Sequence, residues 1–142
     1  MEQPQYNLLN RTRVEDEYAR LYEDIGLGLT TWSPLAGGIL TGKYLDGVPE
    51  GSRATAKGHG HLAEESTKPE TADRVCRVVD MARDLDVTPA QLSLAWLLKN
   101  PHVSTVITGA SSVAQVKDNM GVLTAKERLD DGLKAQLDEI FS

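Results

Sequence analysis

Small and hydroxyl-bearing residues stand between an apolar run and a helix-like run at two places in this chain. The first place is Trp32-Ser33-Pro34-Leu35-Ala36-Gly37, and the second is Thr108-Gly109-Ala110-Ser111-Ser112. In the second, glycine lets the backbone approach a ligand closely, serines supply hydroxyl groups, and the helix that follows would point free N–H groups outward. This run is therefore a candidate site for a phosphate or another small anion. A capped turn without a ligand has the same pattern.

Two cations and one indole could contribute to such a site. Lys43 and Arg53 lie in or beside a long glycine-rich stretch and could reach a phosphate. Solvated surface charge is the commoner reason for residues of this kind. Trp32, at the end of an apolar run, could stack on a planar ring or fill the core, and the core is the commoner place for tryptophan.

Metal and nucleophile chemistry have little support in the sequence. His59-Gly60-His61 has no cysteine or cluster of carboxylates nearby, so we assign no metal site. Cys76 lies in a helical pattern with no histidine or aspartate placed to activate its thiol. As the one cysteine of the chain, it cannot form an internal disulfide, which fits a reducing compartment.

The elements that must position these residues alternate between helical and extended patterns. Apolar residues at helical spacing predict a helix over residues 14–25, ended by Gly26. Short apolar or β-branched runs predict buried strands over residues 27–32 and 103–108. Glycines and prolines between residues 37 and 69 predict a long loop with at most a short helix at 39–44.

Further helices are expected in the second half of the chain. Apolar periodicity predicts one from about residue 69 to 86, and Thr88-Pro89-Ala90-Gln91 has the spacing of a capping box before a helix that Asn100-Pro101 stops. Ser112 and Gln115 repeat that spacing ahead of a helix ending near Gly121, and a last helix carries Leu133, Leu137, Ile140 and Phe141. Helices alternating with strands predict an α/β fold. Two parallel strands alone would leave unpaired edges, so the sheet looks incomplete.

Composition excludes several classes of function. With 142 residues, 40% hydrophobic and 25% charged, the chain is one globular domain or a piece of a larger one. A net charge of −6 argues against a nucleic-acid partner or a polybasic membrane anchor. The chain has no long apolar run for membrane insertion and no signal-peptide pattern at its polar start, so we expect a cytoplasmic location.

Five blocks in order resemble the aldo-keto reductase superfamily. They are Gln3-Pro4-Gln5-Tyr6-Asn7-Leu8-Leu9-Asn10-Arg11; Trp32-Ser33-Pro34-Leu35-Ala36-Gly37-Gly38 with Gly42-Lys43-Tyr44; Ser52-Arg53-Ala54; Thr88-Pro89-Ala90-Gln91-Leu92-Ser93-Leu94-Ala95-Trp96; and Gly109-Ala110-Ser111. The tryptophan block and the Ser-Arg-Ala block look most similar to the branch that contains the β subunits of voltage-gated potassium channels and related microbial and fungal reductases.

The resemblance implies an eight-stranded parallel β/α barrel, the TIM barrel, that binds NADPH in an extended form. Such a barrel typically needs ~250 residues. Residues 1–142 would then be a partial NADP-binding domain, the C-terminal portion of the barrel with about strands seven and eight and their flanking helices, incomplete as a closed barrel.

The resemblance also implies a role for each matching residue. Gln3 would hydrogen-bond the nicotinamide carboxamide, and Trp32 would stack on the nicotinamide ring. Ser33, Pro34, Leu35, Ala36 and Gly37 would line the pyrophosphate, with Lys43 and Arg53 as its cationic partners. Gly109, Ser111 and Gln115 would meet the adenosine ribose and its 2′-phosphate, and Asp118 and Asn119 the adenine. Gln115 stands where many relatives have arginine, which puts the preference for NADP over NAD in doubt.

The family's reaction is reversible hydride transfer between NADPH and an aldehyde or ketone. Its catalytic tyrosine, lysine, aspartate and histidine come from the first half of the barrel, and no segment here matches them, so we assign no catalytic residue. The resemblance favours the NADP(H)-binding part of a reductase, whose small carbonyl substrate would need the missing half-barrel. The alternatives are a non-catalytic nucleotide-binding regulatory protein of the channel-subunit type, or a truncated remnant inactive alone. The expected protein partners are a second copy of the chain or a membrane channel.

Overall fold

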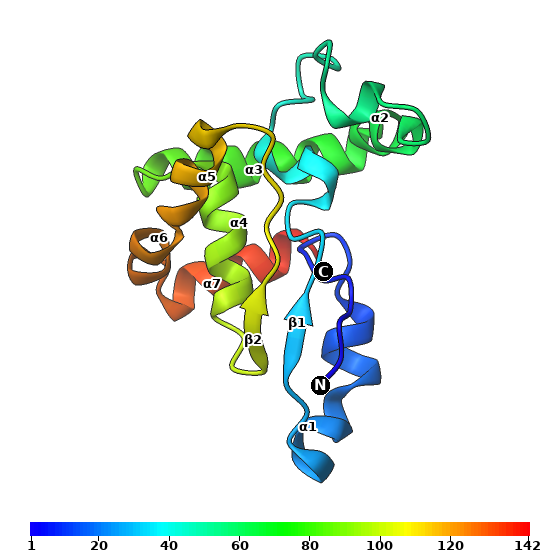
Figure 1. Ribbon diagram of the computed structural model, residues 1–142. Helices are drawn as coiled ribbons and strands as arrows, with labels where there is room; N and C mark the ends of the chain where they lie inside the picture. The colour runs from blue at the N-terminus through cyan, green and yellow to red at the C-terminus, as the bar shows by residue number, and fades with distance from the viewer.

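Two short parallel strands form the sheet of this protein. The computed structural model describes all 142 residues and places β1 (Leu29–Thr31) beside β2 (Val103–Val106), as Figure 1 shows. Thr31 is paired with Val106 at the carboxyl ends, and the register is irregular between Leu29 and Thr30. The predicted strands are confirmed, but each is shorter than its sequence pattern.

The N-terminal segment extends this sheet beyond β1. Glu2 forms a parallel bridge with Leu29, and Gln5 forms one with Trp32. The Glu2 N–H donates to the Gly28 carbonyl at 3.2 Å, and the Thr30 N–H donates to the Glu2 carbonyl at 3.0 Å. Local residue patterns predict no strand here, because Pro4 and the mixed polar residues around it hide the extended backbone. The family resemblance, in contrast, implies that the chain starts at the end of barrel strand six.

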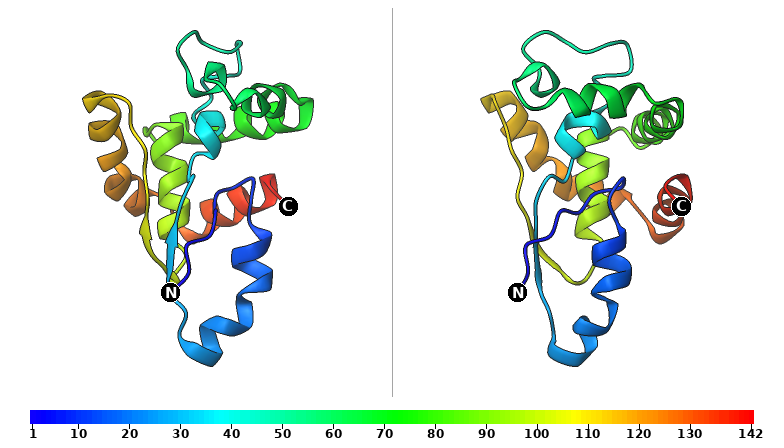
Figure 2. Two further views of the ribbon diagram at one scale, coloured as in Figure 1. Left: turned by 45° about the vertical axis from the view of Figure 1, so that its right-hand side comes forward. Right: turned by 90° about the vertical axis from the view of Figure 1, so that its right-hand side faces the viewer.

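Helices cover one side of these strands. They are the π-helical turn η1 (Arg13–Glu17), α1 (Ala19–Ile25), the 3₁₀ turns η2 (Ala36–Thr41) and η3 (Arg53–Thr55), α2 (Gly60–Thr67), α3 (Pro69–Asp84), α4 (Pro89–Leu98), α5 (Val113–Met120), α6 (Val122–Arg128) and α7 (Asp131–Ile140). The turned view in Figure 2 shows the strands on one side of the molecule and α3, α4 and α7 on the other. No helix is both long enough and apolar enough to cross a bilayer.

The central helix is α4, which contacts α3, α5, α6, β2 and η2. Its residues from Leu92 to Leu97 are all buried, as the nearly uninterrupted apolar run predicts. Thr88 and Gln91 form both hydrogen bonds of the expected capping box at its start. This helix therefore provides the core against which the sheet and the other helices pack.

Helix structure near the N-terminus differs from the single helix expected over residues 14–25. The chain forms η1 first and α1 second, and Ile25 is 70% exposed rather than part of a buried stripe. Figure 1 shows why, since α1 extends past the amino ends of the strands, where nothing covers its tip. Gly26 ends the helix in a left-handed conformation, as predicted.

Two helices, α2 and α6, were not expected. The prediction of a long loop over residues 37–69, with at most a short helix at 39–44, is wrong at its end. Gly60 begins a helix instead of interrupting one, because residues 61–67 contain no further glycine or proline. Leu62 and Ser66, one turn apart, are its buried residues. Gly121 does close α5, but its right-handed φ of −64° lets the chain continue directly into α6.

One face of the sheet is open. Leu29 and Thr31 are completely buried, whereas Thr30 between them is only partly buried. On β2, Ser104 and Thr105 are exposed, which is unusual for parallel strands. The fold is thus a mixed helix and strand structure with a small open parallel sheet, compatible with part of a β/α barrel.

Candidate functional site

Both candidate junctions leave the same edge of the sheet. Because β1 and β2 are parallel, Trp32 and the run 109–112 both follow the carboxyl ends of strands. The Ile107 N–H donates to the Thr31 carbonyl at 2.8 Å, so the two chains are still paired as they leave the sheet. This is the edge at which α/β folds bind their ligands.

Trp32 lies at this edge and is 45% exposed. Its Nε1–H donates to the Gln3 backbone carbonyl at 3.2 Å, and its backbone N–H donates to the Pro4 carbonyl at 3.1 Å. The ring is therefore fixed in orientation while part of it remains free. The core position, the commoner one for tryptophan, is wrong for Trp32; Trp96, only 1% exposed, occupies the core instead.

The backbone after Trp32 adopts conformations that residues with a Cβ rarely take. Ser33 has φ 54° and Ala36 has φ 49°, and Gly37 and Gly38 continue with 67° and 101°. The Tyr44 hydroxyl donates to the Gly37 carbonyl at 3.2 Å and holds the turn from outside. Backbone strain of this kind gathers at ligand sites. Within this turn Pro34 and Ala36 are buried, and Leu35 is partly buried.

Lys43 lies directly against this turn. A Cβ added to Gly38 would come within 2.5 Å of Lys43 Cε and 2.6 Å of its Nζ. The Lys43 ammonium is 5.0 Å from the centre of the Tyr44 ring and forms no ion pair. Arg53, exposed at the start of η3, also lacks a carboxylate partner, and η3 contacts η2. The turn thus has two uncompensated cations in its surroundings.

The second junction begins α5 with a modified capping box. The Ser112 Oγ accepts from the Gln115 N–H at 3.2 Å, as predicted. The Gln115 Oε1 does not return to Ser112; it accepts from the Ser111 N–H at 2.7 Å and from the Ser111 hydroxyl at 3.1 Å. A Cβ added to Gly109 would meet nothing within 4 Å. The junction therefore has free space at Gly109, and Gln115 Oε1 already accepts the hydrogen bonds that Ser111 can donate.

Asp118 and Asn119 lie deeper than the serines. The Asp118 carboxylate accepts from the Thr88 hydroxyl at 3.1 Å and from Gln91 Nε2 at 3.1 Å, which ties α5 to the start of α4. Asn119 is 5% exposed. In this structure both residues serve the packing of α5.

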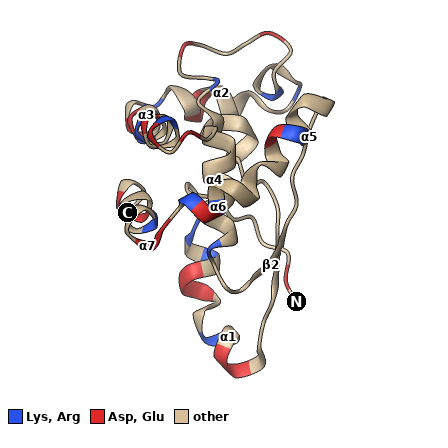
Figure 3. Cartoon of the chain, turned by 90° about the vertical axis from the view of Figure 1, so that its left-hand side faces the viewer, with Lys and Arg blue, Asp and Glu red and all other residues tan.

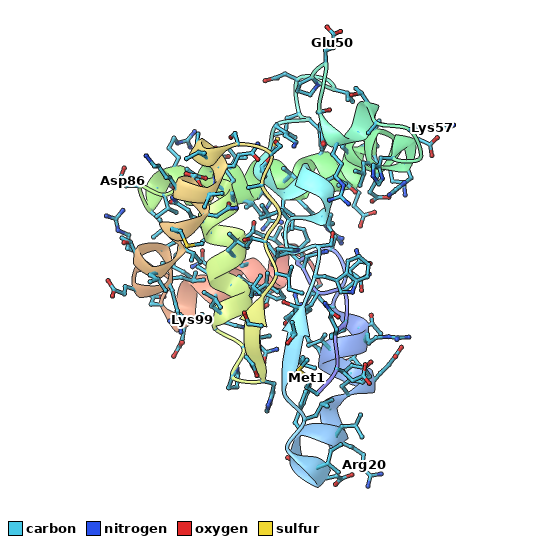
Figure 4. All side chains as sticks on the ribbon, in the orientation of Figure 1. Met1, Arg20, Glu50, Lys57, Asp86 and Lys99 are labelled. Atoms are coloured by element: carbon cyan, nitrogen blue, oxygen red, sulfur yellow. The ribbon has the colours of Figure 1, made fainter.

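A separate cluster of charges lies where α7 crosses η1 and the end of α4. Arg11 forms ion pairs with Glu15 at 2.8 Å and Asp138 at 3.0 Å, and the Tyr6 hydroxyl donates to Glu15 at 2.8 Å. Burial raises the pKa of Tyr6, so its hydroxyl keeps its proton. These groups line a recess of about 390 Å³ that reaches Lys99, labelled in Figure 4 at the end of α4.

Two residues that shape the site, Asn7 and Tyr44, received no role from the sequence, although both lie in blocks that carry the family resemblance. Asn7 donates to the Ser33 carbonyl at 2.9 Å across 26 positions of chain, and Tyr44 holds Gly37. Neither belongs to a periodic or spaced motif. His59 and His61 have ring centres 6.1 Å apart, and no group of three or more metal-binding side chains occurs in the structure.

Comparison with known proteins identifies relatives over most of the chain. The sequence matches the Aldo/keto reductase family over residues 1–141. It is 48% identical over 124 residues to an Oryza sativa subsp. japonica protein named "Probable voltage-gated potassium channel subunit beta"; those residues are 87% of this chain and 38% of that protein. An Arabidopsis thaliana protein of the same name is 46% identical over 121 residues, 84% of this chain and 37% of that protein.

A Schizosaccharomyces pombe protein named "Putative voltage-gated potassium channel subunit beta" is 42% identical over 144 aligned residues. The match covers 99% of this chain and 42% of the yeast protein. The chain therefore spans about two fifths of the length of these relatives. The resemblance seen in the sequence blocks is confirmed, and the chain belongs to the aldo/keto reductase family.

Proposed function

We propose that this chain is the nicotinamide-nucleotide-binding part of an NADPH-dependent aldo-keto reductase. The observation that carries the proposal is the half-exposed indole of Trp32, fixed by Gln3 at the carboxyl edge of the sheet and followed by a strained turn with Lys43 against it. A flat ring beside a cationic turn fits a planar base joined to a phosphate. Residues 1–142 would form a partial domain, with β1 and β2 as strands seven and eight of the barrel.

Within this proposal each part of the chain has one task. Trp32 stacks on the nicotinamide, and the Gln3 side chain, which makes no hydrogen bond of its own, is free to bind the carboxamide. The turn 33–37 with Lys43 and Arg53 takes the pyrophosphate. When bound, the cofactor supplies a hydride for a small carbonyl substrate, and the chain's own residues orient it. The proton donor for the carbonyl would come from outside residues 1–142.

The proposed adenosine end needs a rearrangement of one side chain. Gln115 Oε1 occupies the Ser111 N–H and hydroxyl, so a 2′-phosphate oxygen would replace it as their acceptor. Gly109 leaves room for this, and α5 presents its N-terminus. Asp118 and Asn119 are already engaged in the packing of α5 and would have to meet the adenine from there. Of the residues proposed to bind the cofactor, these two have the least structural support.

Titration with NADPH, followed by two-dimensional amide NMR of the labelled chain, tests the proposal. We expect weak binding, in the millimolar range, because only one side of the cofactor would be held. Chemical shifts should change at residues 33–38 and 109–112 and at the indole N–H of Trp32, and Trp96 should stay unchanged. Trp32→Phe and Lys43→Gln should weaken binding, while Lys57→Gln, on the exposed loop labelled in Figure 4, should not. Shifts spread elsewhere, or none, would contradict the proposal.

The names of the relatives favour a second function. In this alternative the chain is a nucleotide-binding regulatory subunit that docks on a potassium channel in the cytoplasm and reports redox state without turnover. Joining the chain to the N-terminal portion of the fission-yeast relative separates the two. Carbonyl-dependent oxidation of NADPH by the joined protein supports the reductase, and NADPH binding without turnover supports the regulatory subunit.

A further inference from the structure

Asn7 is a buried polar residue in the bend between the N-terminal segment and η1. Its side chain is 1% exposed and uses both ends of its amide. Nδ2 donates to the Ser33 carbonyl at 2.9 Å, and Oδ1 accepts from the Leu9 N–H at 3.0 Å. Because one partner is an acceptor and the other a donor, the orientation of the amide is determined by its surroundings.

The residue that Asn7 holds is the first strained residue of the turn. Ser33 has φ 54°, a left-handed conformation that is unfavourable for a residue with a Cβ. Such a conformation persists where the surrounding structure fixes it. The Asn7 amide is the side-chain group that binds the Ser33 carbonyl.

The same segment also holds the residue before Ser33. The Trp32 N–H donates to the Pro4 carbonyl at 3.1 Å, and the Tyr6 N–H donates to the Trp32 carbonyl at 3.3 Å. Residues 4–7 therefore bind two successive residues, Trp32 with backbone atoms and Ser33 with the Asn7 side chain. The ladder of backbone bonds ends at Trp32, and the asparagine continues it by one residue around the turn.

We infer that Asn7 is a positioning residue for the nicotinamide-nucleotide site: it fixes the Ser33 turn and thereby the direction of the Trp32 ring and of the phosphate-binding backbone. The ligand part of this inference rests on the proposed function. Asn7 touches no ligand itself. Asparagine suits the position because it has one donor and one acceptor on a short side chain, whereas aspartate keeps the acceptor for Leu9 and loses the donor for Ser33.

Fluorine NMR of the chain labelled with 5-fluorotryptophan tests this inference directly. The chain has two tryptophans, so two resonances are expected, and Trp32→Phe assigns them. Asn7→Asp should shift and broaden the Trp32 resonance and leave that of Trp96 in place. It should also raise the dissociation constant for NADPH about tenfold, as expected for losing one well-placed interaction. Asn10→Asp, the same change at an exposed neighbour, should alter neither.

Ser33→Gly provides the second comparison, since glycine adopts a positive φ at little cost. In that background Asn7→Asp should disturb the Trp32 resonance several-fold less. If Asn7→Asp lowers stability too far, Asn7→Ser, which loses the reach to Ser33, replaces it in both backgrounds. Equal shifts of both tryptophans, an unchanged Trp32 resonance, or an undiminished effect with Ser33→Gly would overturn the inference. If the wild-type protein binds no NADPH but Asn7→Asp still shifts only the Trp32 resonance, the proposed function is contradicted. The role of Asn7 in the turn then remains intact.

Discussion

Gly38 shows how a single residue controls the candidate site. Its φ is 101°, and an added Cβ would collide with Lys43. We therefore expect Gly38→Ala to lower the free energy of unfolding by about 1–3 kcal/mol and to displace the Lys43 side chain. Chemical denaturation followed by circular dichroism measures the change.

The matched control is Gly109→Ala in the second junction. An added Cβ there meets nothing within 4 Å, and Gly109 is not among the glycines with positive φ. This variant should stay within about 0.5 kcal/mol of wild type. A Gly38→Ala protein as stable as the Gly109→Ala protein would show that the turn is not strained in solution.

At the residue scale, prediction from sequence succeeded where partners are close in the chain. The bonds between Thr88 and Gln91 and between Ser112 and Gln115 follow from a spacing of three residues. The exposure of Trp32 was not predictable, because it depends on what lies across the sheet. The bond from Asn7 to Ser33 joins distant parts of the chain, and no local pattern encodes it.

At the scale of elements, Asp138 joins α7 to two other parts of the fold. It accepts from Trp96 Nε1 of α4 at 2.9 Å and forms an ion pair with Arg11, ahead of η1, at 3.0 Å. Lys134 of its own helix also donates to it, at 2.8 Å. Burial alone would raise the pKa of Asp138, but the hydrogen bonds from Lys134 and Trp96 outweigh it and hold the pKa below its usual value. We expect Asp138→Asn to lower the free energy of unfolding by about 1 kcal/mol at neutral pH, a modest value because the carboxylate is partly exposed.

The pH dependence gives the sign of this contribution. A carboxyl group whose pKa is lower in the folded state stabilises the fold above its unfolded pKa, about 3.9 for aspartate. That stability is lost as the pH falls through the folded-state value, so the difference between wild type and Asp138→Asn should shrink there. Asp73→Asn, an exposed aspartate of α3 without an ion pair, should show no such difference at any pH. A difference independent of pH would contradict this assignment.

Elements were predicted well where apolar periodicity is long. The patterns that gave α3, α4 and α7 each run over several turns and bury their apolar residues. The helices α2 and α6 are short and follow glycines, so their few buried residues do not make a visible period. The N-terminal segment has no local strand pattern. Its hydrogen bonds to β1 and the bridge between Gln5 and Trp32 identify it as strand-like.

At the scale of the molecule, β2 has a free edge, and the helices that follow it in the chain, α5 and α6, expose apolar side chains. Val113, Val116, Met120 and Leu123, on α5 and α6, are between 48% and 72% exposed. Residues 100–116 contain no Asp, Glu, Lys or Arg, and Figure 3 shows β2 without charge while charges crowd α1 and α3. Charged residues normally protect such edges from pairing with other chains. We expect this chain to associate with itself as its concentration rises.

Sedimentation velocity over a range of concentrations measures that association. The double variant Val116→Lys and Met120→Lys should shift the protein toward monomer, because it places charge on the exposed stripe. Ile25→Lys, which changes an even more exposed apolar residue at the tip of α1, should leave the distribution unchanged. A wild-type chain that is monomeric at every concentration would contradict the expectation.

The fold class of the whole molecule was predicted from the sequence, but the place of each strand in a barrel was not. Alternating helices and strands predicted an α/β fold with an incomplete parallel sheet, and the open sheet agrees. Assigning β1 and β2 to particular strands of a barrel still depends on the resemblance, because two strands have the same local pairing wherever they stand in a closed sheet.

The pairing of Glu2 with the start of β1 also fixes how any fusion partner would be attached. Figure 1 shows the N-terminus at the lower end of the strands. A purification tag or reporter domain joined ahead of Met1 would therefore emerge toward the amino ends of the strands, away from the carboxyl edge that carries the candidate site. A protein immobilised through its N-terminus would therefore still present the carboxyl edge of the sheet to dissolved nucleotides.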